Sequence, residues 1–80
     1  MISSSQIRAA RALLGWSGEE LAAKCEMSLK TLRRYEPQDG IPSGSTSTLL
    51  KIKSVFEEAG VEFTGDPLLN PGVVLHLKSV

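Results

Sequence analysis

The sequence predicts a mainly helical domain in which four short helices precede a two-stranded β-hairpin. Two serines near the N-terminus are each followed three residues later by Gln or Glu, a pattern typical of helix starts. Apolar residues then recur with helical spacing as far as Gly60. The segment beyond is rich in β-branched residues that partly alternate with polar ones. We therefore expect a helical domain over residues 1–60 and a hairpin over residues 61–80.

Length and composition indicate a single small domain. The 80 residues have a hydrophobic fraction of 41% and a charged fraction of 22%, which are typical of a soluble globular protein. No apolar run approaches the ~18 residues that span a bilayer, and the N-terminus lacks a signal-peptide pattern. We therefore expect a cytoplasmic protein without a membrane partner. Cys25 is the only cysteine and is expected in the core, and no cluster of Cys and His predicts a metal site.

The helix boundaries follow from caps and helix-breaking residues. Capping boxes that begin at Ser3 and Ser17 predict helices over about residues 4–14 and 17–25. A third helix starts at the cap Ser28 and runs to about residue 36, where proline follows and disfavours a helical predecessor. A loop dense in Pro, Gly and Ser precedes the fourth helix, which covers about residues 46–59.

The second and third helices, joined by about three residues, have the pattern of a helix-turn-helix over residues 17–36. Its recognition helix would cover residues 28–36. Ala22 supplies a small residue where the helices cross, Met27 an apolar residue in the turn, and Leu32 a buried residue in the third helix. The outer side of that helix is polar and basic: Lys30, Thr31, Arg33 and Arg34. Taken alone, such charges are usually a solvated helix face, but a helix-turn-helix turns this side toward DNA.

Charge is distributed unevenly, although the formal net charge is zero. Residues 1–53 carry eight basic and five acidic side chains, whereas residues 54–80 carry one basic and four acidic side chains. A basic face can therefore exist on a neutral protein. Arg8, Lys51 and Lys53 are candidates either for phosphate contacts or for solvated surface.

The stretch SGEELAAKCEMSLKTLRRYE resembles the helix-turn-helix of the Cro/C1 (Xre) family. The resemblance extends before it to QIRAARALLGW and after it to STLLKIKSVFEEAGVEF. The closing GVVLHLK is similar to the β-segment that ends a subset of short phage and bacterial members. The resemblance implies a four-helix lambda-repressor-like DNA-binding domain with a C-terminal hairpin. It also implies a transcriptional regulator of double-stranded DNA, expected to be a repressor that needs no cofactor and is nucleoid-associated when bound.

The resemblance also implies roles for particular residues. In the family, the first residues of the recognition helix contact base edges and phosphates, and the start of the preceding helix contacts a phosphate. The matching DNA-binding residues here are Ser17, Ser28, Leu29, Lys30, Thr31, Arg33 and Arg34. Arg34 is placed to reach a base and Arg33 the DNA backbone. Arg11 and Glu36 match a pair of positions that form a structural ion pair in phage repressors.

Two residues depart from the family pattern. Gly18 stands where the family has a glutamine that contacts phosphate, so this contact would rely on Ser17 or on backbone N–H groups. Glu26 replaces the glycine of the turn, and we expect it to hold a left-handed conformation with some strain. Both departures predict weaker DNA affinity without changing the expected fold.

A single helix-turn-helix reads few base pairs, so we expect a homodimer on a palindromic operator with half-sites about one helical turn apart. The strand over residues 73–77 is the candidate dimerisation element, because an unpaired strand edge can pair with a second chain. Its apolar residues are Val73, Val74, Leu75 and Leu77. The alternative is a protein–protein interaction module, such as an antitoxin or adaptor. We reject an enzyme, since His76 has no catalytic partner in sequence and no glycine-rich phosphate loop is present.

Overall fold

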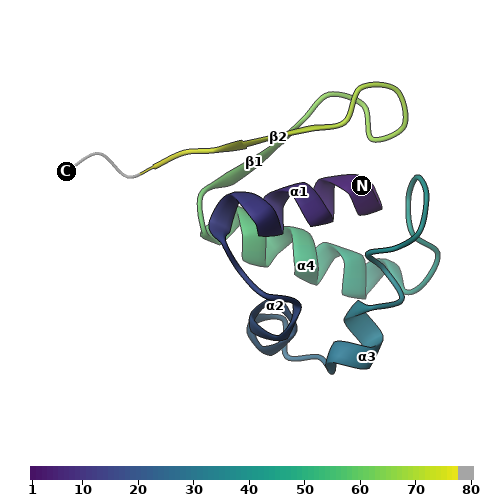
Figure 1. Cartoon of the computed structure of the whole chain (residues 1–80). Helices are drawn as coiled ribbons and strands as arrows, with labels where there is room; N and C mark the ends of the chain where they lie inside the picture. Colours follow the sequence, from purple (N-terminus) through teal and green to yellow (C-terminus); the bar gives the residue numbers. More distant parts are fainter. Residues whose placement is uncertain (78–80) are drawn as a thin grey trace.

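The computed structural model describes residues 1–77 as a mainly helical fold with a two-stranded antiparallel sheet. The elements in chain order are helices α1 (Ser4–Leu14), α2 (Gly18–Lys24), α3 (Leu29–Leu32) and α4 (Thr46–Glu58) and strands β1 (Val61–Thr64) and β2 (Gly72–Leu75). In Figure 1, α1 and α4 lie side by side, with α2 and α3 on one side of this pair and the hairpin on the other. None of the helices within residues 1–77 is long and apolar enough to cross a membrane.

The first two helices begin at the two predicted capping boxes. The Ser3 hydroxyl accepts the Gln6 backbone N–H at 3.2 Å, and the Gln6 side chain accepts the Ser3 backbone N–H at 2.9 Å. The corresponding distances for Ser17 and Glu20 are 3.0 and 3.1 Å. Each box satisfies two backbone donors that an uncapped helix leaves without a partner. The local sequence therefore fixes where these helices start.

The recognition helix is shorter than predicted. It was expected to reach residue 36, but α3 ends at Leu32 and the chain continues in turns. The backbone N–H groups of Arg34 and Tyr35 donate to carbonyls three residues earlier, not four, which tightens the chain beyond an α-helix. Pro37 acts in the same direction, because proline disfavours the α-conformation in the residue before it.

The core lies between α1, α4, the helix-turn-helix and the hairpin. Its most deeply buried apolar residues are Ile7, Ala10, Leu21, Leu32, Ile52 and Phe56. The Phe56 ring stacks on Trp16 with centroids 5.8 Å apart and meets Phe63 edge-on at 6.0 Å. Because Phe63 belongs to β1, the hairpin shares the core of the helices. Cys25 is buried, as the sequence predicted, and Tyr35 is buried as well.

The hairpin has one face on the helices and one in solvent. The paired residues are Val61 with Leu75, Glu62 with Val74, Phe63 with Val73 and Thr64 with Gly72. The first and third pairs pack against the core, whereas the second faces outward. β2 ends at Leu75, two residues before the predicted end. The last residues of the predicted hairpin, 78–80, lie outside the described residues.

One buried side chain connects α1 to both strands. The amide nitrogen of Gln6 donates to the carbonyl oxygen of Gly72 at 2.9 Å and to that of Thr64 at 3.3 Å. The oxygen of the same side chain completes the capping box of α1. Gln6 therefore ties the start of the first helix to the loop end of the hairpin.

Candidate nucleic-acid interface

The two helices of the helix-turn-helix approach each other closely at Gly18. A Cβ on Gly18 would lie 3.3 Å from Leu29 Cδ1, which is tighter than ordinary van der Waals contact. A side chain at this position would therefore displace Leu29. In the structure Leu29 is half-buried against the core, so only part of this predicted DNA-binding residue is accessible.

The turn between α2 and α3 contains the one left-handed residue that is not glycine in the described part of the chain. Glu26 has φ of 56°, as predicted for the position where the family has glycine. Its carboxylate lies 3.4 Å from the Lys51 ammonium of α4. The side chains are 81% and 47% exposed, so this ion pair adds little stability. It nevertheless places a positive charge beside a carboxylate that would otherwise repel phosphate.

The outer side of the recognition segment, residues 28–36, carries accessible positive charge. Lys30, Arg33 and Arg34 are exposed, and within residues 1–77 none of them forms an ion pair. Lys30 lies in α3, whereas the two arginines follow it in the turns. These side chains can therefore approach an anion without first breaking a salt bridge.

Hydroxyl groups cap both helices of the helix-turn-helix. Ser28 caps α3, accepts the Thr31 backbone N–H at 3.1 Å, and lies 2.9 Å from the Thr31 hydroxyl. Ser17 caps α2, where Glu19 and Glu20 add negative charge to the first turn. Acidic residues stabilise a helix N-terminus but oppose a phosphate there. The cap of α3 is therefore the better phosphate position of the two.

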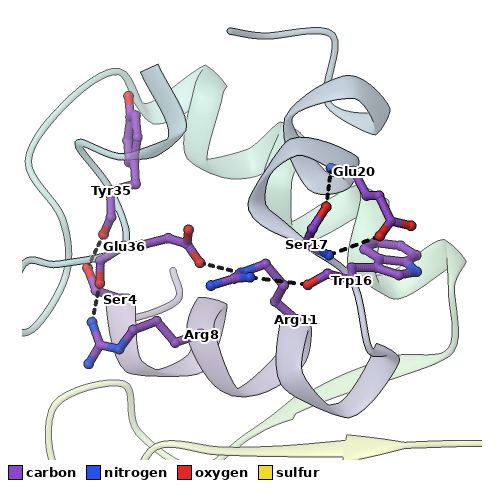
Figure 2. Close-up of polar contacts among 8 residues, drawn as sticks. All are labelled: Ser4, Arg8, Arg11, Trp16, Ser17, Glu20, Tyr35 and Glu36. Carbon is purple, nitrogen blue, oxygen red and sulfur yellow. Dashed lines mark hydrogen bonds and ion pairs between the residues drawn. The ribbon is translucent and has the colours of Figure 1, made fainter. Parts of the chain in front are cut away.

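Arg11 and Glu36 lie in direct contact. Arg11 Nε is 2.8 Å from Glu36 Oε2, and the side chains are 31% and 12% exposed. The Arg11 guanidinium also donates to the carbonyl oxygen of Trp16 at 3.2 Å. Figure 2 shows the guanidinium between these two groups. This contact joins the end of the recognition segment to α1.

Two further α1 residues contact the same segment, and the sequence interpretation did not identify them. The Ser4 hydroxyl donates to the Tyr35 carbonyl oxygen, and the Arg8 guanidinium donates to the Glu36 carbonyl oxygen. Arg8 had been considered for phosphate contact or solvated surface. The available signal was its helical spacing from Arg11, which places both side chains on the same side of α1.

The predicted dimerisation residues do not share one environment. Val73 and Leu75 pack partly against the core, whereas Val74 and Leu77 are 43% and 82% exposed. Only the latter two leave a large part of their apolar surface free for contact with a second chain.

The fold and its basic outer side define a helix-turn-helix DNA-binding domain. A helix-turn-helix family model of the Cro/C1 type matches residues 7–56, more than half of the chain. The protein therefore belongs to this family of DNA-binding regulators, which confirms the resemblance found in the sequence. No curated protein is similar enough to the chain to count as a match.

Proposed function

We propose that the protein is a sequence-specific transcriptional repressor that binds a palindromic operator as a homodimer. The observation that carries this proposal is the set of exposed basic side chains on the recognition segment, which make no ion pair within residues 1–77. Occupying an operator requires only DNA binding, so no cofactor is invoked.

The position of each side chain suggests its role on DNA. Arg34 and Lys30 are assigned to guanine acceptors, with which Arg and Lys pair well. Thr31 and the exposed part of Leu29 are assigned to nearby base edges, including a thymine methyl group. The DNA backbone is assigned to Arg33 and to the hydroxyls of Ser17 and Ser28.

Selection of bound duplexes from a random DNA pool tests this proposal and reports the site and its symmetry. The selected duplex should lose affinity steeply as salt rises, because bound phosphates release counterions. Arg34→Ala should weaken binding by about 1–3 kcal/mol and relax preference at a single base position. Because Lys53 lies 3.8 Å from Glu57 within α4, we assign it to the solvated surface and not to a phosphate contact. Lys53→Ala removes the same charge as Arg34→Ala and therefore serves as the matched control. Failure to enrich any sequence contradicts sequence-specific binding.

The proposed dimer uses the open edge of β2. The His76 backbone N–H donates to the Gly60 carbonyl oxygen. In an antiparallel pair, the backbone groups of successive residues point alternately toward and away from the partner strand. The N–H and C=O groups of Val73 and Leu75 therefore point away from β1. An edge with unpaired backbone groups can pair with the same strand of a second chain. The exposed side chains of Val74 and Leu77 would then be partly covered.

Paired lysine substitutions test this interface without truncating the core. Val74→Lys with Leu77→Lys should produce monomers in sedimentation at concentrations where the wild type is dimeric, because like charges would meet across the interface. Leu68→Lys with Leu69→Lys adds the same charge to exposed positions in the hairpin loop and should leave the dimer intact. A wild-type monomer, or equal effects of the two double variants, contradicts a dimer through β2.

The second candidate is a protein–protein interaction module, such as an antitoxin or adaptor. The zero net charge and the two glutamates at the start of α2 favour it, because both reduce attraction to DNA. Salt titration separates the two functions. DNA binding that is weak at low salt and unaffected by Arg34→Ala favours the interaction module.

A further inference from the structure

A row of three polar side chains on α1 contacts the end of the recognition segment. Ser4, Arg8 and Arg11 are spaced by four and three residues, which places them on one face of a helix. They contact, in the same order, the carbonyl of Tyr35, the carbonyl of Glu36 and the carboxylate of Glu36. Figure 2 shows all three reaching this short stretch of chain.

The contacted stretch lies directly after the residues with the exposed guanidinium groups. Arg33 and Arg34 follow the last α-helical residue, Leu32, so the turns in which they lie are not part of a continuing helix. Gln38 adds another contact here, because its side-chain nitrogen donates to the Arg34 carbonyl oxygen. Side chains from outside the recognition segment therefore hold the backbone that carries its two arginines.

Burial of the two acceptor residues, Tyr35 and Glu36, makes these contacts difficult to replace, although Arg8 itself is exposed. Ser4 is fully buried and Tyr35 is 5% exposed, so water has little access to the hydrogen bond between them. A buried carbonyl that loses its donor is destabilised unless the chain moves to find another partner. Removing either α1 donor should therefore shift the turn that follows α3.

We propose that Ser4 and Arg8 are positioning residues for DNA recognition, which set the direction of Arg33 and Arg34 by fixing the carbonyls of Tyr35 and Glu36. The inference rests on the proposed DNA-binding function. It assigns the Arg8 guanidinium to the protein backbone in place of a phosphate. It also extends the anchoring of the recognition segment beyond the contact between Arg11 and Glu36.

The test compares Ser4→Ala and Arg8→Ala on the selected duplex and on duplexes altered at single bases. Both variants should lose about tenfold in discrimination at the base position read by Arg34. The dependence of log affinity on log salt should stay close to the wild-type slope, because Ser4 and Arg8 contact no phosphate and Arg33 keeps its charge beside the DNA backbone. Ser4 provides the sharper comparison, since a fully buried hydroxyl cannot contact DNA.

The controls separate positioning from charge and from folding. Arg8→Lys keeps a donor and should restore part of the discrimination lost in Arg8→Ala, whereas Lys53→Ala should leave it unchanged. A salt slope reduced by about one in Arg8→Ala, with discrimination intact, means that Arg8 contacts a phosphate and overturns the inference. Unchanged discrimination in both alanine variants also overturns it.

Measurements on the free protein distinguish failure of this inference from failure of the proposed function. Backbone amides of residues 33–36 should exchange faster with solvent in Ser4→Ala and Arg8→Ala, while those of α4 stay protected. Wild-type protein that binds no DNA contradicts the proposed function. Unchanged exchange in both variants contradicts the positioning role, whether or not DNA binds.

Discussion

At the scale of single residues, the helix-turn-helix contains one backbone conformation that its sequence does not favour. Glu26 has φ of 56°, a region that residues with a Cβ rarely adopt. Its main-chain N–H still donates to the Ala23 carbonyl at 3.1 Å, so the turn is intact despite the strain. The ion pair with Lys51 is too exposed to compensate for much of it.

Replacing Glu26 by glycine should therefore stabilise the protein relative to replacing it by alanine. Both variants lose the carboxylate and its contact with Lys51, but only glycine removes the Cβ that disfavours the left-handed conformation. We expect the free energy of unfolding to be about 1 kcal/mol higher for Glu26→Gly than for Glu26→Ala. Urea denaturation of the two variants measures this difference. Equal stability would show that the turn relaxes when the side chain is shortened.

Cys25 should make stability depend on pH in the alkaline range. Burial raises the pKa of its thiol from 9.0 to about 11, and the positive charge of Lys51 partly opposes that rise. Because the unfolded chain releases this proton first, the contribution is complete below pH 9 and is lost as pH rises to about 11. Wild type should lose about 2 kcal/mol more than Cys25→Ala over this interval in urea denaturation. Parallel pH profiles would contradict a buried neutral thiol.

At the scale of secondary-structure elements, the starts of helices were predictable and the end of the recognition helix was not. The caps at Ser3, Ser17 and Ser28 depend on residues three positions apart, so sequence alone reveals them. The turns that follow α3 are contacted by donors from α1, such as Ser4, which is 31 residues from its partner Tyr35. Such contacts appear only when the tertiary structure brings the elements together.

The candidate DNA-binding site also combines features that the sequence predicts with features that depend on tertiary contacts. Helical periodicity identified the basic side of the recognition segment, because those side chains lie near one another in sequence. It did not reveal that Leu29 is half-buried beside Gly18, since this depends on how closely α2 approaches α3. Similarly, alternation identified the apolar residues of β2, whereas their burial depends on packing against the helices.

Gln6 provides a test of how α1 and the hairpin depend on each other. Gln6→Glu keeps the oxygen that accepts the Ser3 N–H but replaces the amide donor to Gly72 and Thr64 with a carboxylate oxygen. We expect a loss of about 2 kcal/mol in unfolding free energy at neutral pH, because buried carbonyls would face a negative charge. Amide exchange should increase in the hairpin and remain slow in α1. Gln6→Ala also removes the cap of α1, so amide exchange should increase in both α1 and the hairpin. If the hairpin amides stay as protected in Gln6→Glu as in wild type, Gln6 does not hold the hairpin to α1.

At the scale of the whole molecule, the charges and the hairpin support the same requirement for two copies. Residues 1–53 carry a net charge of +3 and residues 54–80 a net charge of −3, so the whole chain has a formal net charge of zero. One protomer therefore has weak long-range attraction to DNA, and its affinity depends on the local basic side of the recognition segment. Figure 1 shows the hairpin on the side of the α1 and α4 pair opposite α3. In the proposed dimer, pairing through β2 would therefore leave that basic side of each protomer free.

Binding to a palindrome should consequently depend on the β2 edge far more than binding to one half-site. Val74→Lys with Leu77→Lys should reduce affinity for a full palindrome by about tenfold or more, because the second half-site would no longer be bound by a tethered partner. On a duplex with a single half-site, the affinity of this double variant should equal or slightly exceed that of wild type, since added lysines attract DNA. Leu68→Lys with Leu69→Lys carries the same added charge and should bind the palindrome at least as tightly as wild type. Fluorescence anisotropy measures the affinity of all three proteins for the two duplexes. If Val74→Lys with Leu77→Lys lost the same affinity on both duplexes, the substitutions would act on DNA contacts and not on dimerisation.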